Sequence, residues 1–479
     1  MKHRVGITGR HGFLGTSLDR YLQRYEDEIE VIPFSRDMFS QPHDLIEFCR
    51  NCDTIVHFAA VTRGDEEAVY RVNMDLVLSL CSALEHVEHV PHVIYASSVH
   101  ETRNTGYGRS KREGRMLLEE WARKNGSPFT GLVIPNVFGP FCRPFYLSFI
   151  ATFCYQLTHG QEAEIHVDAL MNLVYVEELM ELLVSLIRTG PQESCITVPP
   201  GGVFLVSEVL EKLTGFRDLY CVQGIVPPLD EPFDRRLFTT FHSYVEPAHF
   251  PVPLDVSREG DTRVAAPGEK DREGVVISML ASGGEKDHEK VVISMLASGG
   301  EKDRGKAVVS MLASGGEKDR GRAAVSMLAS GGEKDRERAA VSMLASGGEK
   351  DRGRAITSML ASGGEKDRER AAVSVLALGG EKDRGRAVVS VLAPGKRMGN
   401  HYHAETFERL SILQGNASLR MRRIDSEWVT EYDLDGDAPG YIDIPVYHTH
   451  EITNTGVSDL VTVVWSDTSD ERDTFFETI

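Results

Sequence analysis

The chain has 479 residues, with 72 Asp and Glu against 53 Lys and Arg, so its formal net charge is -19. This length allows two or three domains, and the acidic balance argues against nucleic-acid binding, which needs a basic face. No apolar run is as long as the roughly 18 residues of a membrane helix, and the seven scattered cysteines suit a reducing compartment, so we expect a cytoplasmic protein without membrane association.

Residues 1–250 alternate short apolar runs with amphipathic segments. Five runs rich in aliphatic residues predict buried strands: Arg4–Thr8, Glu30–Phe34, Thr54–Ala60, His92–Ser97 and Gly131–Pro135. A helix is predicted for Lys111–Lys124, because Gly126 follows it as a helix C-terminal glycine does. Strand–helix alternation of this kind predicts an α/β Rossmann domain with a doubly wound parallel sheet.

A glycine-rich turn follows the first predicted strand and begins a helix. Its glycines let the backbone approach a pyrophosphate at the helix N-terminus. The cofactor-binding residues expected in this turn are Gly9, Arg10, His11, Gly12, Phe13, Leu14 and Gly15. After the second strand, Arg36 replaces the usual acidic residue and suits the 2′-phosphate of NADPH, although a surface arginine without a ligand is the alternative.

Three further residues predict a catalytic site. Tyr107 and Lys111 are four residues apart and so share one helix face, where the ammonium is expected to favour the phenolate. Ser98, at the end of the fourth strand, can hydrogen-bond a carbonyl that is being reduced.

With His57–Ala60, Asn73 and Pro135–Gly139, these residues resemble the extended short-chain dehydrogenase/reductase family over about residues 1–250. The resemblance implies that Ser98, Tyr107 and Lys111 are catalytic, with Tyr107 as the proton donor. It also implies that Lys111 and Ala59 contact the cofactor. Nucleotide-sugar members of the family often carry an arginine just before the Pro-Asn motif, where this chain has Val133 and Ile134.

The chain continues through a linker, residues 251–267, into a repeat block. The 16-residue unit G-E-K-D-R-x-x-A-V-V-S-M-L-A-S-G occurs eight times between Gly268 and Gly395. Copies this alike indicate tandem duplication, so we expect an insertion without chemistry of its own. Strands between Gly-Gly turns are favoured for the unit, with short helices and disorder as alternatives.

Residues 396–479 predict an all-β domain, because short apolar runs alternate with Gly, Asp and Asn turns. The expected strands are Leu410–Leu413, Ala417–Met421, Trp428–Tyr432, Tyr441–Ile444 and Leu460–Trp465.

Three histidines and a glutamate in this region predict a metal site: His401, His403, Glu408 and His450. His401 and His403 point to the same side of a strand. We expect Glu408 on the adjoining strand and His450 on the opposite hairpin. This ligand set suits Zn²⁺, Fe²⁺, Mn²⁺ or Ni²⁺, and zinc is our expectation.

The spacings resemble both motifs of the cupin family, which implies a metal-binding barrel. Gly395 and Gly415 frame the first motif, and Pro445 and Asn454 frame the second. Tyr447 stands where a glycine is usual.

The linked pair resembles the bifunctional reductase/epimerases that make UDP-2-acetamido-2,6-dideoxy-L-talose for capsule or O-antigen. The segments that carry this likeness are 144–154, 173–176, 394–403 and 462–465. The last repeat copy matches the first barrel strand of that family. The resemblance implies NADPH-dependent reduction at C4 of a UDP-4-keto-6-deoxy-HexNAc, C3 epimerisation in the cupin domain, and a UDP-sugar partner. A homodimer is expected.

Other readings of the second half stay open. The cupin domain of a reductase or 4,6-dehydratase-like enzyme could serve only to bind sugar or to dimerise. It could also be a metal-dependent oxygenase, or the repeats could have made the chain a non-catalytic scaffold. Position alone gives three candidates for the acid/base of epimerisation: Lys396, Tyr447 and His448.

Overall fold

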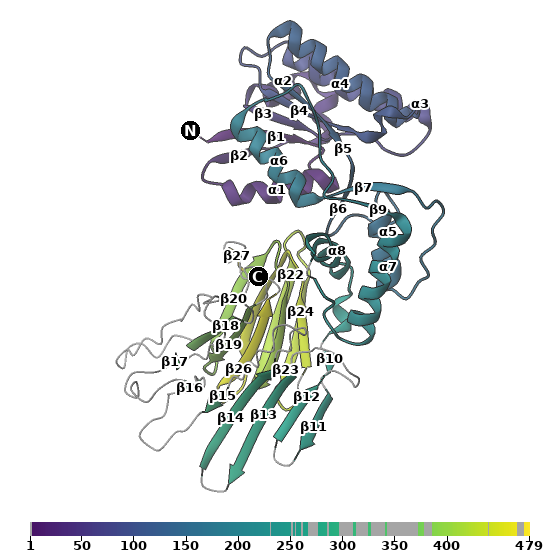
Figure 1. Cartoon of the computed structure of the whole chain (residues 1–479). Helices are drawn as coiled ribbons and strands as arrows, with labels where there is room; N and C mark the ends of the chain where they lie inside the picture. Colours follow the sequence, from purple (N-terminus) through teal and green to yellow (C-terminus); the bar gives the residue numbers. More distant parts are fainter. Residues whose placement is uncertain are drawn as a thin grey trace, which may run out of the picture. The chain divides into compact units, whose positions relative to one another are not determined.

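The computed structural model describes residues 2–229, 231–250, 386–438, 440–466 and 474–479, and between 251 and 385 only the strands β10–β18 (Figure 1). By its internal contacts the chain divides into two units. The first contains Met1–Gly215 and Leu229–Tyr244, and the second contains Phe216–Pro228 and Val245–Ile479. Among the helices of the described ranges, none combines the length and hydropathy that a membrane span needs.

The first unit is built on a six-stranded sheet with the strand order β2-β1-β3-β4-β5-β8, in which every pair is parallel. Its strands are β1 (His3–Thr8), β2 (Ile29–Ile32), β3 (Thr54–His57), β4 (His92–Ser98), β5 (Phe129–Ile134) and β8 (Cys195–Thr197). All five predicted strands are confirmed, because aliphatic runs with both faces buried suit a central parallel sheet.

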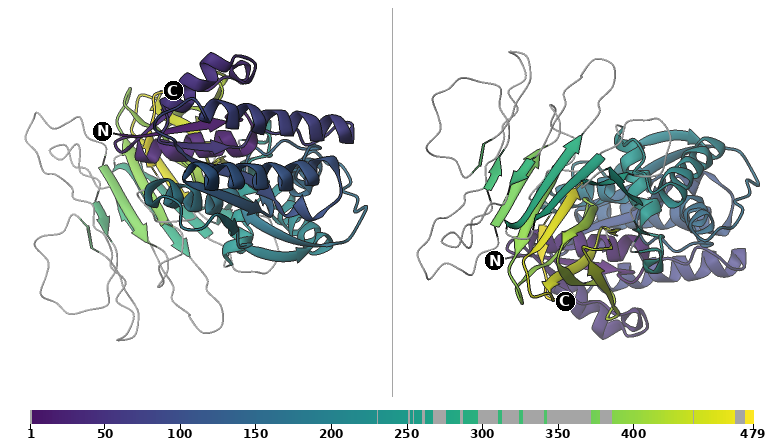
Figure 2. Two further views of the ribbon diagram at one scale, coloured as in Figure 1. Left: turned by 90° about the horizontal axis from the view of Figure 1, so that it is seen from above. Right: turned by 90° about the horizontal axis from the view of Figure 1, so that it is seen from below.

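Helices cover both faces of this sheet. They are α1 (Phe13–Leu22), α2 (Pro42–Arg50), α3 (Glu66–Leu84), α4 (Gly106–Asn125) and α6 (Val176–Thr189), with short 3₁₀ turns η1 (Gln23–Tyr25), η2 (Arg36–Ser40) and η3 (Val99–Thr102). In Figure 1, α2, α3 and α4 lie on one side of the sheet and α1 and α6 on the other. Helices α3 and α4 pack along each other, as Figure 2 also shows.

Helix α4 contains the predicted helix Lys111–Lys124 and begins before it, as the shared helix face of Tyr107 and Lys111 requires. Thr105 accepts a hydrogen bond from the Gly108 amide at 3.1 Å, so the helix begins at Gly106 and includes Tyr107. It ends at Gly126, whose φ of 62° lies in the left-handed region that glycine tolerates. The N-terminal cap therefore fixes the orientation of the helical turn that carries Tyr107 and Lys111.

The strand order reverses between β1 and β3. From β1 the chain crosses outward to β2, then returns to place β3 on the other side of β1. Ligands of open α/β sheets bind outside the carboxyl ends of the strands at such a switch point. The glycine-rich turn after β1 and the loop after β3 both lie there.

A small sheet and three helices complete the first unit. The sheet contains β6 (Asn136–Phe138), β7 (Leu170–Tyr175) and β9 (Gly202–Leu205). The helices are α5 (Phe149–Thr158), α7 (Val206–Phe216) and α8 (Pro232–His242), and α5 packs against α8.

The second unit contains two antiparallel sheets that carry the candidate metal ligands. One has the order β10-β24-β21-β26-β19-β18 and the other the order β23-β22-β25-β20-β27. Their strands are β10 (Val252–Pro253), β18 (Ala372–Ala377), β19 (Arg386–Leu392), β20 (Arg397–His403), β21 (Glu408–Gln414), β22 (Asn416–Arg423), β23 (Val429–Asp435), β24 (Gly440–Ile444), β25 (His448–Asn454), β26 (Leu460–Ser466) and β27 (Thr474–Phe476). The five predicted strands are confirmed, whereas the closed cupin barrel stays a prediction.

Where the structure describes the repeat block up to residue 392, the backbone is in strands. These are β13 (Val276–Gly284), β14 (Asp287–Leu296), β15 (Ser310–Leu312), β16 (Ala324–Ser326) and β17 (Val341–Ser342), followed by β18 and β19; β11 (Asp255–Glu259) and β12 (Thr262–Ala266) precede them. The rest of the block lies outside the described residues. The fold of the repeat unit therefore stays a prediction.

Residues 216–228, which were expected in the N-terminal domain, pack within the second unit. They include the π-helical turn η4 (Arg217–Val222). The Tyr220 hydroxyl donates to Asp443, a fully buried residue of β24. Arg409 of β21 donates to both oxygens of Asp443 at 2.7 Å and to the Gly224 carbonyl at 3.0 Å. This buried charged cluster ties the segment to the sheet, because each group would be costly to bury alone.

Candidate functional sites

The glycine-rich turn has the backbone geometry that a nucleotide site requires. Gly9 has a φ of 74°, and a Cβ there would lie 2.8 Å from the Ala59 amide nitrogen. A Cβ on Gly15 would lie 2.3 Å from the Gly9 carbonyl oxygen. Side chains are therefore excluded at both positions, and the loop after β3 packs directly on the turn.

Helix α1 begins beside this turn without a side-chain cap, so its first amides can bind an anion. Arg10, expected at the cofactor, makes an ion pair with Asp19 of α1 at 2.9 Å. Arg36 is exposed at the start of η2, after β2. The arrangement suits NADPH, and the individual cofactor contacts stay predictions.

The three predicted catalytic residues lie together. Ser98 ends β4 and is hydrogen-bonded to the Tyr107 phenol. Lys111 is buried one turn further along α4, with its ammonium 5.8 Å from the Tyr107 ring centre. That ammonium donates to the Ala96 carbonyl at 2.7 Å, which fixes it against the carboxyl-terminal part of β4. The site therefore combines a phenol, a hydroxyl and an ammonium at the carboxyl end of the sheet.

The electrostatics of this site differ from expectation at Tyr107. Burial raises the pKa of Tyr107 to about 12, although the hydrogen bond with Ser98 lowers it. Burial lowers the pKa of Lys111 to about 8. The expectation that the nearby ammonium favours the phenolate was therefore wrong, because desolvation of the buried phenol dominates its pKa. At neutral pH Tyr107 is thus a protonated phenol, able to donate a proton to a developing alkoxide.

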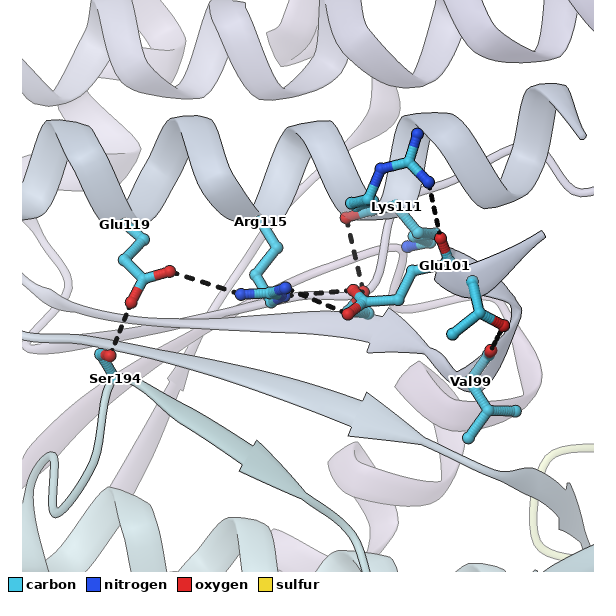
Figure 3. Close-up of polar contacts among 9 residues, drawn as sticks. Val99, Glu101, Lys111, Arg115, Glu119 and Ser194 are labelled. Carbon is cyan, nitrogen blue, oxygen red and sulfur yellow. Dashed lines mark hydrogen bonds and ion pairs between the residues drawn. The ribbon is translucent and has the colours of Figure 1, made fainter. Parts of the chain in front are cut away.

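A polar network that sequence reasoning missed supports the same site (Figure 3). Glu101, in the turn after Ser98, accepts hydrogen bonds from Ser97 at 2.7 Å and from Arg115 of α4 at 3.0 and 3.1 Å. Arg115 also contacts Glu119, which accepts a hydrogen bond from Ser194 at 2.6 Å. The network ties the turn carrying Ser98 to the helix carrying Tyr107. The only signal in the sequence was the position of Glu101 just after the Ser-Ser pair.

The candidate metal ligands also lie together, but on strands other than those expected. His401 and His403 are on β20, and His450 is on the neighbouring strand β25, directly opposite His401. Glu408 is on β21, in the other sheet. We expected Glu408 on the strand adjoining His401 and His403, and His450 on the opposite hairpin. That expectation was wrong, because the consecutive strands β20 and β21 belong to different sheets.

Nitrogen and oxygen atoms converge at this place. The Nε2 atoms of His403 and His450 lie 3.5 and 3.4 Å from the two Glu408 carboxylate oxygens. Ligand atoms of His401, His403 and Glu408 all lie within 4.8 Å of one another. His450 is outside that group of three but contacts the same carboxylate.

The protonation states fit a divalent metal. Burial lowers the pKa of His450 to about 4 and also lowers that of His401, so both are neutral at pH 7. Burial opposes ionisation of Glu408, but its interactions with His403, His450 and His401 bring its pKa down to about 2. Neutral imidazoles and an ionised carboxylate are the forms that bind metal. The four residues therefore fit a divalent metal ion. Metal binding, and zinc as the metal, stay predictions.

The three acid/base candidates are in or next to the strands that carry the histidine ligands, β20 and β25. Tyr447 has a φ of 58°, and its amide donates to the His403 carbonyl at 2.6 Å. His448 is two residues before His450 and so on the same face of β25. Burial lowers the pKa of His448 to about 4. Lys396 is exposed just before β20. No geometry selects one of the three.

Comparison with known families gives two matches in this chain. Residues 5–197 match the NAD dependent epimerase/dehydratase family, and residues 375–475 match the polysaccharide biosynthesis C-terminal domain. The first covers most of the described first unit, and the second covers the candidate metal ligands. The chain is an NAD(P)-dependent enzyme.

One curated relative is a UDP-2-acetamido-2,6-beta-L-arabino-hexul-4-ose reductase of Pseudomonas aeruginosa. The two are 29% identical over 264 residues, which is 54% of this chain and 69% of the relative.

Two solved structures have lower similarity. The capsular polysaccharide assembling protein CapF of Staphylococcus aureus is 23% identical with a TM-score of 0.47, over 99% of this chain and 100% of the other. RMD of Pseudomonas aeruginosa, complexed with NADPH, is 18% identical with a TM-score of 0.45, over 51% and 99%. At these TM-scores neither likeness bears on function.

Proposed function

We propose that the chain reduces the C4 ketone of a UDP-4-keto-6-deoxy-HexNAc with NADPH, after inversion at C3 in the C-terminal unit. The product is UDP-2-acetamido-2,6-dideoxy-L-talose, used in polysaccharide biosynthesis. The observation that carries the proposal is the meeting of Ser98, Tyr107 and Lys111 beside a glycine-rich turn. The 29% identity to a reductase of a UDP-linked hexulose supports the substrate class.

In the first unit the chain supplies the proton and the charge balance. NADPH, when bound, supplies the hydride that C4 accepts. Ser98 hydrogen-bonds the C4 oxygen, and Tyr107 gives that oxygen its phenolic proton. The Lys111 ammonium then offsets the negative charge left on Tyr107. Its bond to the Ala96 carbonyl, 2.7 Å long, holds it in place through the reaction.

In the second unit the chain supplies a ligand cage and a fixed orientation for the sugar. His401, His403, His450 and Glu408 would hold a divalent metal, which when bound supplies the Lewis acidity that makes the C3 proton of a 4-ketone acidic. One side chain accepts the C3 proton on one face of the sugar, and an acid on the opposite face donates a proton to C3, which inverts that carbon. Tyr447, His448 and Lys396 are the residues to test for these roles.

Turnover of a UDP-4-keto-6-deoxy-HexNAc with NADPH tests the proposal, with the configuration of the product determined at C3 and C4 by NMR. We expect inversion at C3 and reduction at C4. Reduction without inversion would leave the first unit's role standing and reject that of the second. No oxidation of NADPH would reject the substrate class.

Exchange of the C3 proton with deuterated water, in the absence of NADPH, isolates the epimerisation. We expect exchange with the full chain and none with a His401→Ala variant. Equal exchange in the two proteins would remove the metal site from the reaction and leave the second unit as a sugar-binding module.

A further inference from the structure

The last strand of the chain lies against the strand that carries two candidate metal ligands. Strand β27 pairs antiparallel with β20, with Thr474 opposite His403 and Phe476 opposite His401. The Thr474 hydroxyl lies 3.5 Å from His403 Nδ1, and Phe475 stacks on Tyr402 with ring centres 5.1 Å apart. The ligand strand β20 is therefore flanked by β25 on one side and by the chain end on the other.

Glu477, the residue after β27, contacts three strands of this sheet. Its carboxylate accepts hydrogen bonds from Arg422 of β22, at 2.9 Å, and from the Thr449 hydroxyl of β25. Its amide donates to the Asn400 carbonyl of β20, at 2.9 Å. A single residue thus bridges β22, β25 and β20.

Two of the three groups that Glu477 holds immediately precede a candidate ligand. Asn400 precedes His401, and Thr449 precedes His450. Asn400 is also the irregular residue of β20, with a φ of 58° at a shift of register between Gly399 and His401. A bulge redirects the side chain that follows it, so its conformation decides where the His401 imidazole points.

The surroundings of Glu477 favour a fixed geometry. Thr449 is fully buried, and the Arg422 side chain is only 15% exposed. A hydrogen bond to an ionised carboxylate is stronger than one between neutral groups. The Glu477 contacts lie outside the metal cage, as do the partners that orient ligands in known metal sites.

We propose that Glu477 is a positioning residue for the metal site, holding His401 and His450 in register through Asn400 and Thr449. This inference rests on the metal site of the proposed function. It adds that the geometry of the four metal ligands, and so their affinity for a metal ion, depends on Glu477.

Metal binding to the full, EDTA-treated chain tests this role. Because loss of an outer partner typically costs about 10–100-fold in metal affinity, Glu477→Gln should weaken Co²⁺ binding by at least about 10-fold and alter the Co²⁺ visible spectrum. Glu431→Gln is the matched control: Glu431 accepts a hydrogen bond from Ser418 at 2.6 Å, on strand β23 at the far edge of the same sheet. It should leave both readouts unchanged.

A second pair of variants keeps Glu477 itself intact. Thr449→Val removes one hydroxyl and preserves shape, so it should weaken Co²⁺ binding, whereas Thr449→Ser should restore it. Wild-type affinity and spectrum in both Glu477→Gln and Thr449→Val would overturn the positioning role while leaving the metal site intact. Absence of Co²⁺ binding by the wild-type chain would instead overturn the metal site, and the inference with it.

Discussion

Burial shifts the pKa values of the two titrating catalytic side chains in opposite directions. It raises the pKa of Tyr107 to about 12 and lowers that of Lys111 to about 8, because desolvation disfavours the charged form of each. The phenol is therefore protonated at neutral pH, and the ammonium is close to its titration point. A phenol that can donate a proton, beside an ammonium that can balance the charge left behind, suits reduction of a ketone.

Removal of the phenolic hydroxyl should abolish most of the reductase activity. We expect Tyr107→Phe to lower kcat by about 10²–10⁴-fold, the usual contribution of a positioned acid, with unchanged NADPH affinity. Steady-state kinetics and NADPH fluorescence measure the two quantities. Tyr25→Phe, in the connection before β2 at the amino end of the sheet, is the control and should keep wild-type kcat. A Tyr107→Phe enzyme with wild-type kcat would rule out the phenol as proton donor.

The pH profile should report Lys111. Below about pH 8 the ammonium is present, and as the pH rises through 8 its charge is lost, so kcat/KM should fall on the alkaline side. In Lys111→Arg the charge persists, so the alkaline fall should vanish while kcat is lower at every pH. A wild-type profile that stays flat to pH 10 would contradict this assignment.

At the scale of elements, the reductase site depends on the junction between β4 and α4. Ser98 ends β4 and Glu101 follows it, whereas Tyr107, Lys111 and Arg115 are on α4. The Glu101–Arg115 ion pair joins the two, and its side chains are only 13% and 15% exposed. Water screens such a pair much less than a surface ion pair.

Loss of the Glu101 charge should loosen this junction. We expect Glu101→Gln to lower the free energy of unfolding by about 1–3 kcal/mol, because Arg115 loses its ionic partner. Urea unfolding followed by bound NADPH fluorescence measures the change. Glu120→Gln on the same helix, which breaks an exposed pair with Lys124, should leave the free energy of unfolding unchanged, because water screens that pair. An equal loss of unfolding free energy in the two variants would mean that the Glu101–Arg115 pair stabilises the fold no more than an exposed ion pair does.

For the whole molecule, the repeat block is the feature without an assigned role. Its eighth copy contains β19, which pairs with β26 from Leu392 opposite Leu460 to Arg386 opposite Ser466. Asn454, the last residue of the strand β25 that carries His450, donates to the Leu392 carbonyl at 2.7 Å. The last copy is thus tied into the sheet by described contacts, unlike an appended insertion.

Deletion of the first seven copies should leave the enzyme active. We expect a chain lacking Gly268–Gly379 to keep or raise the wild-type rate of NADPH oxidation, because the eighth copy still supplies β19. A longer deletion that also removes Arg386–Leu392 should abolish Co²⁺ binding, since β26, which pairs with the Glu408 strand β21, loses its other neighbouring strand. Loss of reductase activity in the shorter deletion would assign the repeats a structural role.

Local patterns in the sequence were sufficient for much of the first unit. Apolar runs predicted five strands, because a strand buried on both faces needs few polar residues. The glycines at 9 and 15 predicted the turn, because a positive φ or a close backbone approach excludes side chains. The Ser98, Tyr107 and Lys111 grouping followed from a strand end and one helix face.

Contacts between distant residues were not predictable in this way. Glu477 lies 28 residues from Thr449 and 55 from Arg422, and Tyr220 lies 223 residues from Asp443. No periodicity or spacing links such pairs, since only the packed sheets bring them together. The same holds for Glu408, whose sheet could not be inferred from its position after His403.

Residue types and spacing alone establish which chemical groups are present: a phenol and an ammonium on one helix, and three imidazoles with a carboxylate in the last 80 or so residues. The protonation of these groups, and the residues that hold them in place, depend on how the chain folds. Burial set the pKa values of Tyr107 and Lys111. Sheet pairing placed His450 beside His401 and brought the last residues of the chain onto the strands that carry them. Desolvation and strand pairing depend on what packs around a residue, which is a property of the folded chain.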